Sequence, residues 1–258
     1  MNILVTVKQI PDPAQPGELD PATKTLKREG KLILDESDSY GVEMALQLRD
    51  AAGGGEVILA SIAPNDEVSG LRTALAMGAD RAILVSDPAL QGSDALTTAK
   101  LIAKCVERAG DVDLVITATE STDGYTGTVP AQVGELLGWP SLTFTRHIEI
   151  TDGVAKTERQ TEAGYDEVEA PLPVVVAVTA GVVEPRYPSF KGIMAAKNKP
   201  VDTVTAADLG VTPVGWAGAR QEITSIEAAP PRAAGEKFED DGTGAEKIVA
   251  FLENLKVV

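Results

Sequence analysis

Residues 172–200, LPVVVAVTAGVVEPRYPSFKGIMAAKNKP, decide the fold, because a continuous apolar strand leads straight into a loop that carries prolines, aromatic rings and basic residues. The stretch Leu172–Val178 is apolar without alternation, which is typical of a strand buried on both faces in a parallel sheet. Pro185 and Pro188 fix their own φ and push the residues before them, Glu184 and Tyr187, toward extended conformations. The stretch therefore predicts a central strand followed by a stiffened loop.

The loop at residues 184–194 has the composition of a protein-binding surface. It carries Arg186, Tyr187 and Phe190, and aromatic and arginine side chains supply much of the energy of protein interfaces. Stiffness before binding lowers the entropic cost of association. The alternative is that both rings fold back onto the core, since apolar side chains of loops are commonly buried.

Strands and helices are expected to alternate before this loop. Strand character is found at residues 3–7, 56–63, 81–85 and 112–118, and helices are expected after the capping residues 35–39, at 66–77, after Ser93 and at 129–137. Such alternation predicts an α/β fold with a doubly wound, mostly parallel sheet. Lys8–Pro13 follows the first strand without a glycine-rich turn, so the sheet is Rossmann-like without the GxGxxG fingerprint.

Further elements complete the predicted domain organisation. Residues 26–34 are expected to form a hairpin, and short strands with turns are expected over 142–169. Residues 1–211 are predicted to be one α/β nucleotide-binding domain that includes the loop 184–194. Residues 212–258 are predicted to be an extended arm that ends in an amphipathic helix, whose apolar face needs a partner surface.

Ligands of doubly wound sheets bind beyond the carboxyl ends of the strands. Residues 119–128, TESTDGYTGT, follow the fourth strand and precede a helix with Pro130 in its first turn. Hydroxyl groups, glycines and free N–H groups at a helix N-terminus attract anions. We therefore expect a nucleotide phosphate at Thr126, Gly127 and Thr128, the alternative being a plain capping loop.

Composition excludes several classes of function. The net charge of −16 argues against a nucleic-acid partner, while Lys191, Lys197 and Lys199 form either a local basic group that steers an acidic protein or an ordinary solvated loop. The absence of a membrane-length apolar run and of a signal-like N-terminus predicts no membrane insertion, and the single Cys105 fits the cytoplasm. We find no metal-ligand cluster and no catalytic constellation, and His147 is expected to be structural.

Three stretches carry a resemblance to a known family. EPRYPSFKGIMAAKNKP at 184–200 resembles the partner-recognition loop of the beta subunit of electron transfer flavoproteins. AGYDEVEAPLPVVVAV at 163–178 is similar to the family signature, and RTALAMGAD at 72–80 also agrees. The order of elements resembles the family up to about Val211.

The resemblance implies an electron-carrier subunit without catalytic residues of its own. Its obligate partner would be an alpha subunit that holds most of the FAD, its electron donors acyl-CoA dehydrogenases or other flavin dehydrogenases, and its acceptor a membrane quinone oxidoreductase. The positions that match the AMP site are Thr6, Asp35, Asp38, Ile62, Asp123, Gly124, Tyr125, Thr126, Gly127 and Thr128. Those that match the docking loop are Glu184, Arg186, Tyr187, Phe190, Ile193 and Met194.

Other interpretations stay open at this point. Asp35 stands where the family commonly has Asn, and the loop at 119–128 is shorter than in many members, so the site could hold a second FAD, as in the bifurcating branch. The alternating sheet alone would also suit a stand-alone adenine-nucleotide-binding stress or signalling domain. A third class is a nucleotide-dependent enzyme such as an adenylating ligase.

Overall fold

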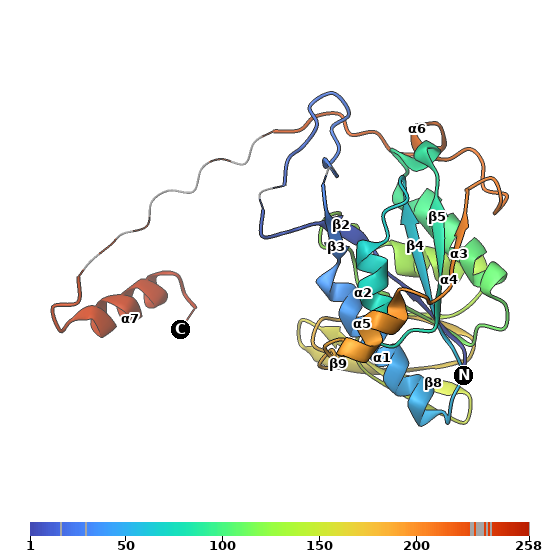
Figure 1. The fold of residues 1–258 in the computed structure, drawn as a ribbon. Helices are drawn as coiled ribbons and strands as arrows, with labels where there is room; N and C mark the ends of the chain where they lie inside the picture. Colours follow the sequence, from blue (N-terminus) through green and yellow to red (C-terminus); the bar gives the residue numbers. More distant parts are fainter. Residues whose placement is uncertain are drawn as a thin grey trace. The chain divides into compact units, whose positions relative to one another are not determined.

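The fold is described from a computed structural model, which describes residues 1–15, 17–28, 30–227, 230, 235, 237 and 239–257. The chain divides into two units, Met1–Thr224 and Ser225–Val258. The first unit holds the sheet and its helices (Figure 1). The predicted arm, 212–258, contains residues outside the described ones, and its boundary at Val211 stays a prediction.

The first unit is built on a nine-stranded sheet within the described residues. Its strands, in spatial order, are β11 (Val201–Val204), β5 (Arg81–Ser86), β4 (Val57–Ala63), β1 (Ile3–Thr6), β6 (Leu114–Ala118), β10 (Val174–Val178), β7 (Ser141–Thr151), β8 (Val154–Thr161) and β9 (Gly164–Pro171). The strands from β11 to β7 run parallel, and β8 and β9 add an antiparallel edge. The predicted α/β, mostly parallel sheet is confirmed.

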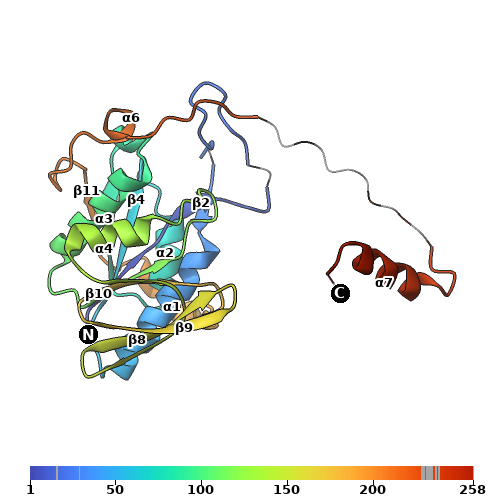
Figure 2. The same cartoon turned by 180° about the vertical axis from the view of Figure 1, so that it is seen from behind.

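Helices cover both faces of the parallel part of the sheet. The helices of the first unit are α1 (Glu36–Ala51), α2 (Ser69–Met77), α3 (Ala95–Ala109), α4 (Val129–Leu137), α5 (Phe190–Ala196) and the short α6 (Gly215–Gly218), with a 3₁₀ turn, η1 (Pro88–Leu90). One apolar cluster joins the sheet to α1 and α2, and a second joins it to α3 and α4. Helices α3 and α4 lie side by side in front of the sheet in Figure 2.

Local signals explain where these helices begin and end. Asp35 is the N-cap of α1, and its carboxylate accepts from the backbone N–H of Ser37 at 3.1 Å. Gly78 closes α2 with φ 141°, as the sequence predicts. The predicted cap of α3 is wrong by one residue: Asp94 caps it, and the Ser93 hydroxyl accepts from the N–H of Gly215 instead.

The predicted hairpin at residues 26–34 does not form. Strand β3 (Leu32–Leu34) pairs antiparallel with β2 (Gln9–Pro11), and Leu26 makes an isolated bridge with Leu19. Glu29, in the middle of the predicted turn, lies outside the described residues. The pairing instead joins the chain after β1 to the chain before α1, so both segments lie near the carboxyl end of β1.

The stretch 172–200 folds largely as predicted. Strand β10 is buried at all five residues and lies between β6 and β7. The one correction concerns Phe190, which is not on the loop but is the first residue of α5, because the Ser189 hydroxyl accepts from the N–H of Gly192 at 3.0 Å. The alternative in which the two rings return to the core is excluded, since Tyr187 is 93% and Phe190 81% exposed.

The second unit contains helix α7 (Gly244–Asn254), which confirms the predicted C-terminal helix. Its exposed apolar residues include Ile248, Phe251 and, just beyond its end, Leu255. Among the described helices of both units, none combines the length and apolar character needed to cross a membrane.

Candidate functional site

A cavity of about 310 Å³ lies at the carboxyl ends of β1, β4 and β6. Thr6, Ile62 and Ala118, at or near the ends of these strands, all line it. Strand β1 leads through α1 to β4 on one side, whereas β6, which follows later in the chain, lies on its other side. The cavity therefore lies at a point where the strand order reverses, the usual ligand position in open α/β sheets.

Three helices begin at this cavity. Asp38 in the first turn of α1, Ala95 at the start of α3 and Val129 at the start of α4 all line it. The N-terminal end of a helix carries partial positive charge and free N–H groups. The convergence of three such ends favours an anionic ligand group here.

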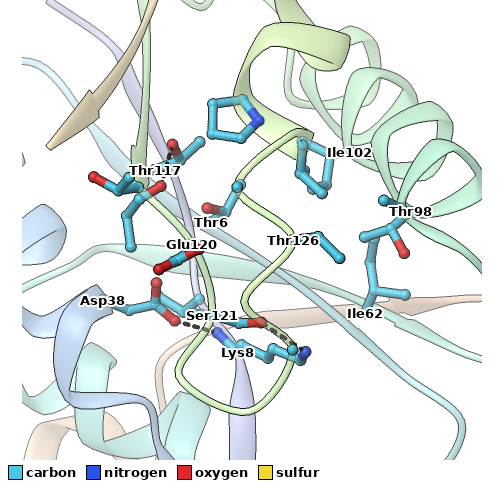
Figure 3. Close-up of a pocket in the computed structure, with 18 of the residues that line it drawn as sticks. Thr6, Lys8, Asp38, Ile62, Thr98, Ile102, Thr117, Glu120, Ser121 and Thr126 are labelled. Carbon is cyan, nitrogen blue, oxygen red and sulfur yellow. Dashed lines mark hydrogen bonds between the residues drawn. The ribbon is translucent and has the colours of Figure 1, made fainter. Parts of the chain in front are cut away.

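The loop between β6 and α4 is fixed by a buried carboxylate, Asp123. Its Oδ1 lies 2.6 Å from Lys8 Nζ, and its Oδ2 pairs with Nη2 of Arg28. Lys8 Nζ also donates to the hydroxyl of Ser121 at 3.2 Å (Figure 3). Burial alone raises the pKa of Asp123, but Lys8 and Arg28 outweigh it, so this pKa is lowered and the carboxylate stays charged.

The last residues of this loop carry backbone donors that are not used within the described residues. Among the described residues, no acceptor is found for the backbone N–H groups of Thr126, Gly127 and Thr128. Tyr125 has φ 48° and Gly127 φ 63°, and a left-handed conformation at a non-glycine residue is a strained one that is common at binding sites. This geometry suits the cradling of a phosphate.

Asp38 is a second carboxyl group of the cavity and is 5% exposed. Its Oδ2 accepts from the backbone N–H of Lys8 at 2.6 Å. Burial raises the pKa of Asp38 well above its ordinary value, the Lys8 hydrogen bond lowers it, and the charge of Asp35 raises it further. The site thus contains one carboxyl group that favours its neutral form beside another, Asp123, that is held charged.

The predicted nucleotide-site residues fall into two groups. Those that line the cavity are Thr6, Asp38, Ile62, Gly124, Thr126 and Gly127. Four others stand behind or outside it. Asp35 and Asp123 hold the loop, Tyr125 is exposed, and Thr128 is the N-cap of α4.

Several lining residues were not among the site residues predicted by number, although three of them belong to the predicted ligand segment 119–128. They are Val7, Lys8, Ala60, Ser93, Asp94, Ala95, Thr98, Ile102, Thr117, Ala118, Thr119, Glu120, Ser121, Val129, Pro130 and Gln221. In Figure 3, Thr98 and Ile102 lie on the opposite side of the cavity from Asp38. Lys8 follows the first strand by two residues and could have been found by that position, whereas Gln221 comes from a distant segment that carries no such signal.

Asp94 connects that distant segment to the cavity. Its Oδ1 accepts from the N–H of Thr97 at 2.8 Å and its Oδ2 from the N–H of Arg220 at 2.7 Å. Burial raises the pKa of Asp94, but these hydrogen bonds outweigh it and the pKa is lowered. The carboxylate therefore holds residue 220, and with it Gln221, against the start of α3.

The predicted docking residues form a second surface. Glu184, Arg186, Tyr187, Phe190, Ile193 and Met194 are all exposed, and the last three lie on one face of α5 because they are spaced three and four residues apart. Of the predicted basic group, Lys191 and Lys197 are exposed, but Lys199 Nζ donates to the carbonyl of Leu75 at 3.0 Å. Lys199 therefore binds carbonyl groups at the C-terminal end of α2 and is not part of an exposed basic group.

Among the described residues, no group of histidine, cysteine, aspartate and glutamate side chains is arranged to hold a metal ion. Cys105 is buried among the apolar residues that join α3 to the sheet, and burial raises the pKa of its thiol to about 12. His147 lies on β7, where its Nε2 is 3.3 Å from Oε1 of Glu149.

The chain is similar to known proteins over its whole length. A family model described as "Electron transfer flavoprotein domain" matches residues 23–209. The chain is 40% identical over 264 residues to the electron transfer flavoprotein subunit beta of Mycobacterium tuberculosis (strain ATCC 25618 / H37Rv), covering 100% of this chain and 99% of that protein. It is 38% identical over 259 residues to the subunit of the same name from Thermoanaerobacterium thermosaccharolyticum, with 99% and 98% covered. It is 35% identical over 255 residues to the caffeyl-CoA reductase-Etf complex subunit CarD of Acetobacterium woodii, with 98% and 96% covered.

Proposed function

Because the chain belongs to the electron transfer flavoprotein family, as one of its beta subunits, we propose that it is the nucleotide-binding and docking half of a heterodimeric electron carrier. The alpha subunit is its partner and holds most of the FAD near the subunit interface. The beta subunit itself performs no chemical step. It positions the other components of the electron-transfer complex.

The cavity at the ends of β1, β4 and β6 is the proposed AMP site. Its support is the set of donors: the N–H groups of Thr126, Gly127 and Thr128 suit a phosphate, and the three helix N-termini add positive potential. The apolar side chains of Ile62 and Ile102 offer a wall for the adenine ring. Among the predicted residues, Asp35 and Asp123 act on the ligand only through the loop that they hold.

The exposed face of α5, together with Tyr187 in the segment before it, is the proposed docking surface for an acyl-CoA dehydrogenase or a similar flavin dehydrogenase. The observation that carries this part is the exposure of Tyr187 and Phe190, at 93% and 81%. Aromatic side chains this exposed on a cap-stabilised helix are favourable contact residues for another protein. Docking fixes the donor while the flavin of the alpha subunit accepts electrons and passes them to a membrane quinone oxidoreductase.

The proposed location is the cytoplasm, in keeping with a chain whose one cysteine cannot form an internal disulfide. A stand-alone nucleotide-binding domain is less favoured, because it would leave both the exposed face of α5 and the apolar face of α7 without a role. A nucleotide-dependent ligase would have to turn over ATP, and we propose no ATP turnover for this chain.

A second FAD in place of AMP is the remaining alternative for the cavity. The volume of about 310 Å³ is at the lower end of the range for small-molecule sites and suits a mononucleotide better than a dinucleotide. The test is extraction of nucleotide from the purified heterodimer. We expect AMP and FAD in equal amounts. If the extract contains FAD alone, at two molecules per heterodimer, the cavity holds a second FAD and not AMP.

A further inference from the structure

A buried acidic residue on α1, Glu43, makes three hydrogen bonds to Arg186, in the chain before α5. Its side chain is 3% exposed, and its Oε2 lies 2.6 Å from Nε of Arg186, while its Oε1 lies 2.9 Å from Nη2. Oε2 also accepts from the backbone N–H of Arg186 at 3.3 Å, and Gln47 Nε2 donates to Oε1 at 2.8 Å. The carboxylate is therefore fully hydrogen-bonded, and three of its four bonds go to one residue.

This geometry fixes the direction of the loop as well as its position. Two parallel bonds from a planar guanidinium allow one relative orientation of the two side chains, which a single ion pair does not. The third bond, from the main chain of Arg186, places the backbone itself against α1. Burial raises the pKa of Glu43, but the bonds from Arg186 and Gln47 outweigh it and the pKa is lowered, so the pair is charged.

The contact between Glu43 and Arg186 lies close, along the chain, to the exposed rings of Tyr187 and Phe190. Tyr187 follows Arg186 directly, and Pro188 and Ser189 then lead into α5, where Ser189 caps the first turn. Pro185 and Pro188 restrict the backbone on both sides of Tyr187. Few freely rotating backbone bonds therefore separate the Glu43 contact from Phe190.

The far end of α5 is fixed by a second set of contacts. Arg72 Nη1, on α2, donates to the carbonyl of Ala196 at 2.7 Å and to that of Lys199 at 2.8 Å. Gly192 lies so close to α2 that an added Cβ would be 2.4 Å from the carbonyl oxygen of Ala76. Helix α5 lies beside α2 in Figure 1, held at both ends by groups of this chain alone.

From these contacts we propose that Glu43 is a positioning residue for docking, and that Arg186 acts through Glu43 to set the loop and not as a direct contact of the partner. The inference rests on the proposed docking function. The surface at Tyr187 and Phe190 is then ordered before the dehydrogenase arrives, and the association does not lose affinity to the ordering of a flexible segment.

The test uses the intact heterodimer with an acyl-CoA dehydrogenase as electron donor. Glu43→Gln keeps the shape of the side chain but removes its charge, and we expect it to raise KM for the heterodimer about tenfold with kcat at saturation unchanged. Glu135→Gln is the matched control, since Glu135 is exposed on α4, and it should leave both constants unchanged. Arg186→Lys keeps the charge but loses the fork and should behave as Glu43→Gln does.

Hydrogen exchange of the free heterodimer gives a readout that does not depend on turnover. The amides of α5 should be protected without a dehydrogenase and should exchange faster in Glu43→Gln, while those of α4 stay unchanged. Unprotected amides in the wild type, or a normal KM in Glu43→Gln, would overturn the proposal. Phe190→Ala distinguishes the docking function from the positioning role of Glu43. If Phe190→Ala raises KM and Glu43→Gln does not, the docking function is supported and the positioning role of Glu43 is refuted. If neither variant changes KM, both the docking function and the positioning role are refuted.

Discussion

Asp35 and Thr122 are joined by two hydrogen bonds, in which Oδ2 of Asp35 accepts from the backbone N–H at 2.8 Å and from the hydroxyl at 3.1 Å. Oδ1 of the same carboxylate accepts from the N–H and the hydroxyl of Ser37, at 3.1 and 2.7 Å. One fully buried side chain therefore caps α1 and holds the loop that leads to α4. Two sides of the proposed nucleotide site depend on it.

Asp35→Ala is expected to weaken both the fold and nucleotide binding. The helix cap and the loop contact are lost together, which should cost about 2 kcal/mol of unfolding free energy. Asp35→Asn keeps a carbonyl acceptor and should lose less. Urea unfolding of the heterodimer at fixed concentration, with AMP content measured on the same samples, checks this. Equal loss in the two variants would contradict the assigned role of the hydrogen bonds.

Asp123→Asn is expected to destabilise the protein by about 1 to 2 kcal/mol at neutral pH, because Lys8 and Arg28 lose their common counter-charge but remain partly solvated. The pKa of Asp123 is lowered in the fold, so its stabilisation is present above its ordinary value of 3.8 and is lost only as pH falls through the folded pKa. The cost of the substitution should therefore be constant between about pH 5 and pH 8. Unfolding curves across that range measure it, and a cost that changes steadily would be inconsistent with a carboxylate held charged.

Asp38→Asn, unlike Asp123→Asn, is expected to change the stability of the protein by an amount that depends on pH. Because the pKa of Asp38 is raised in the fold, its stabilisation is complete below 3.8 and declines as pH rises toward the folded pKa, where the buried group must ionise. Asparagine keeps an acceptor for the N–H of Lys8 and never ionises. Relative to the wild type, the variant should gain stability as pH rises above 3.8 and should stop gaining once pH has passed the folded pKa of Asp38. Unfolding curves measured over the same pH range test this prediction. If the variant loses stability relative to the wild type as pH rises, Asp38 is not buried in its neutral form.

Phe190→Ala is expected to leave the heterodimer and its flavin intact and to weaken electron transfer from the dehydrogenase. A ring that is 81% exposed contributes little to the fold, whereas truncating a central aromatic contact commonly costs about 2 kcal/mol of binding. Steady-state kinetics with varied heterodimer should give a KM raised by at least about tenfold. An undiminished rate at low heterodimer concentration would refute the docking role of this residue.

Gly192→Ala is expected to displace α5 from α2, since the new Cβ would meet the carbonyl of Ala76 at 2.4 Å. Docking should weaken although no exposed side chain changes. Ala195→Ser is a suitable control, because Ala195 is exposed on the same helix. Kinetics of both variants beside circular dichroism of the heterodimer would separate a moved helix from an unfolded one. Similar KM values in the two variants would mean that the contact with α2 does not set the docking surface.

Local patterns were sufficient for most elements of the fold. Helix α4 begins and ends at Val129 and Leu137 as predicted, and the turns at 151–153 and 162–164 separate β7, β8 and β9. These features depend on residues close together in the chain: a proline in a first turn, Asp-Gly and Ala-Gly pairs, and runs of apolar side chains. The strands β7 to β9 are longer than the short strands predicted, because β8 pairs antiparallel with both of its neighbours along most of its length.

Pairing between distant segments was not predictable in the same way. Residues 32–34 have the composition of a strand, but their partner is residues 9–11, and nothing in the local pattern identifies it. The start of α5 was not predicted although Ser189 is a typical N-cap residue, because Pro185 and Pro188 favour an extended chain up to that residue. At the cavity, Thr6 and Ile62 were expected from the family resemblance, whereas Asp94 and Gln221 meet there only through the folded path of the chain.

The contact between Asp94 and Arg220 shows that the cavity needs a longer part of the chain than the sheet does. A chain shortened to end at Val211 would retain all strands of the nine-stranded sheet, whose last member ends at Val204. It would lack Gln221 and the main-chain donor that meets Asp94. The segment that completes the sheet and the segment that completes the wall of the cavity therefore end at different residues.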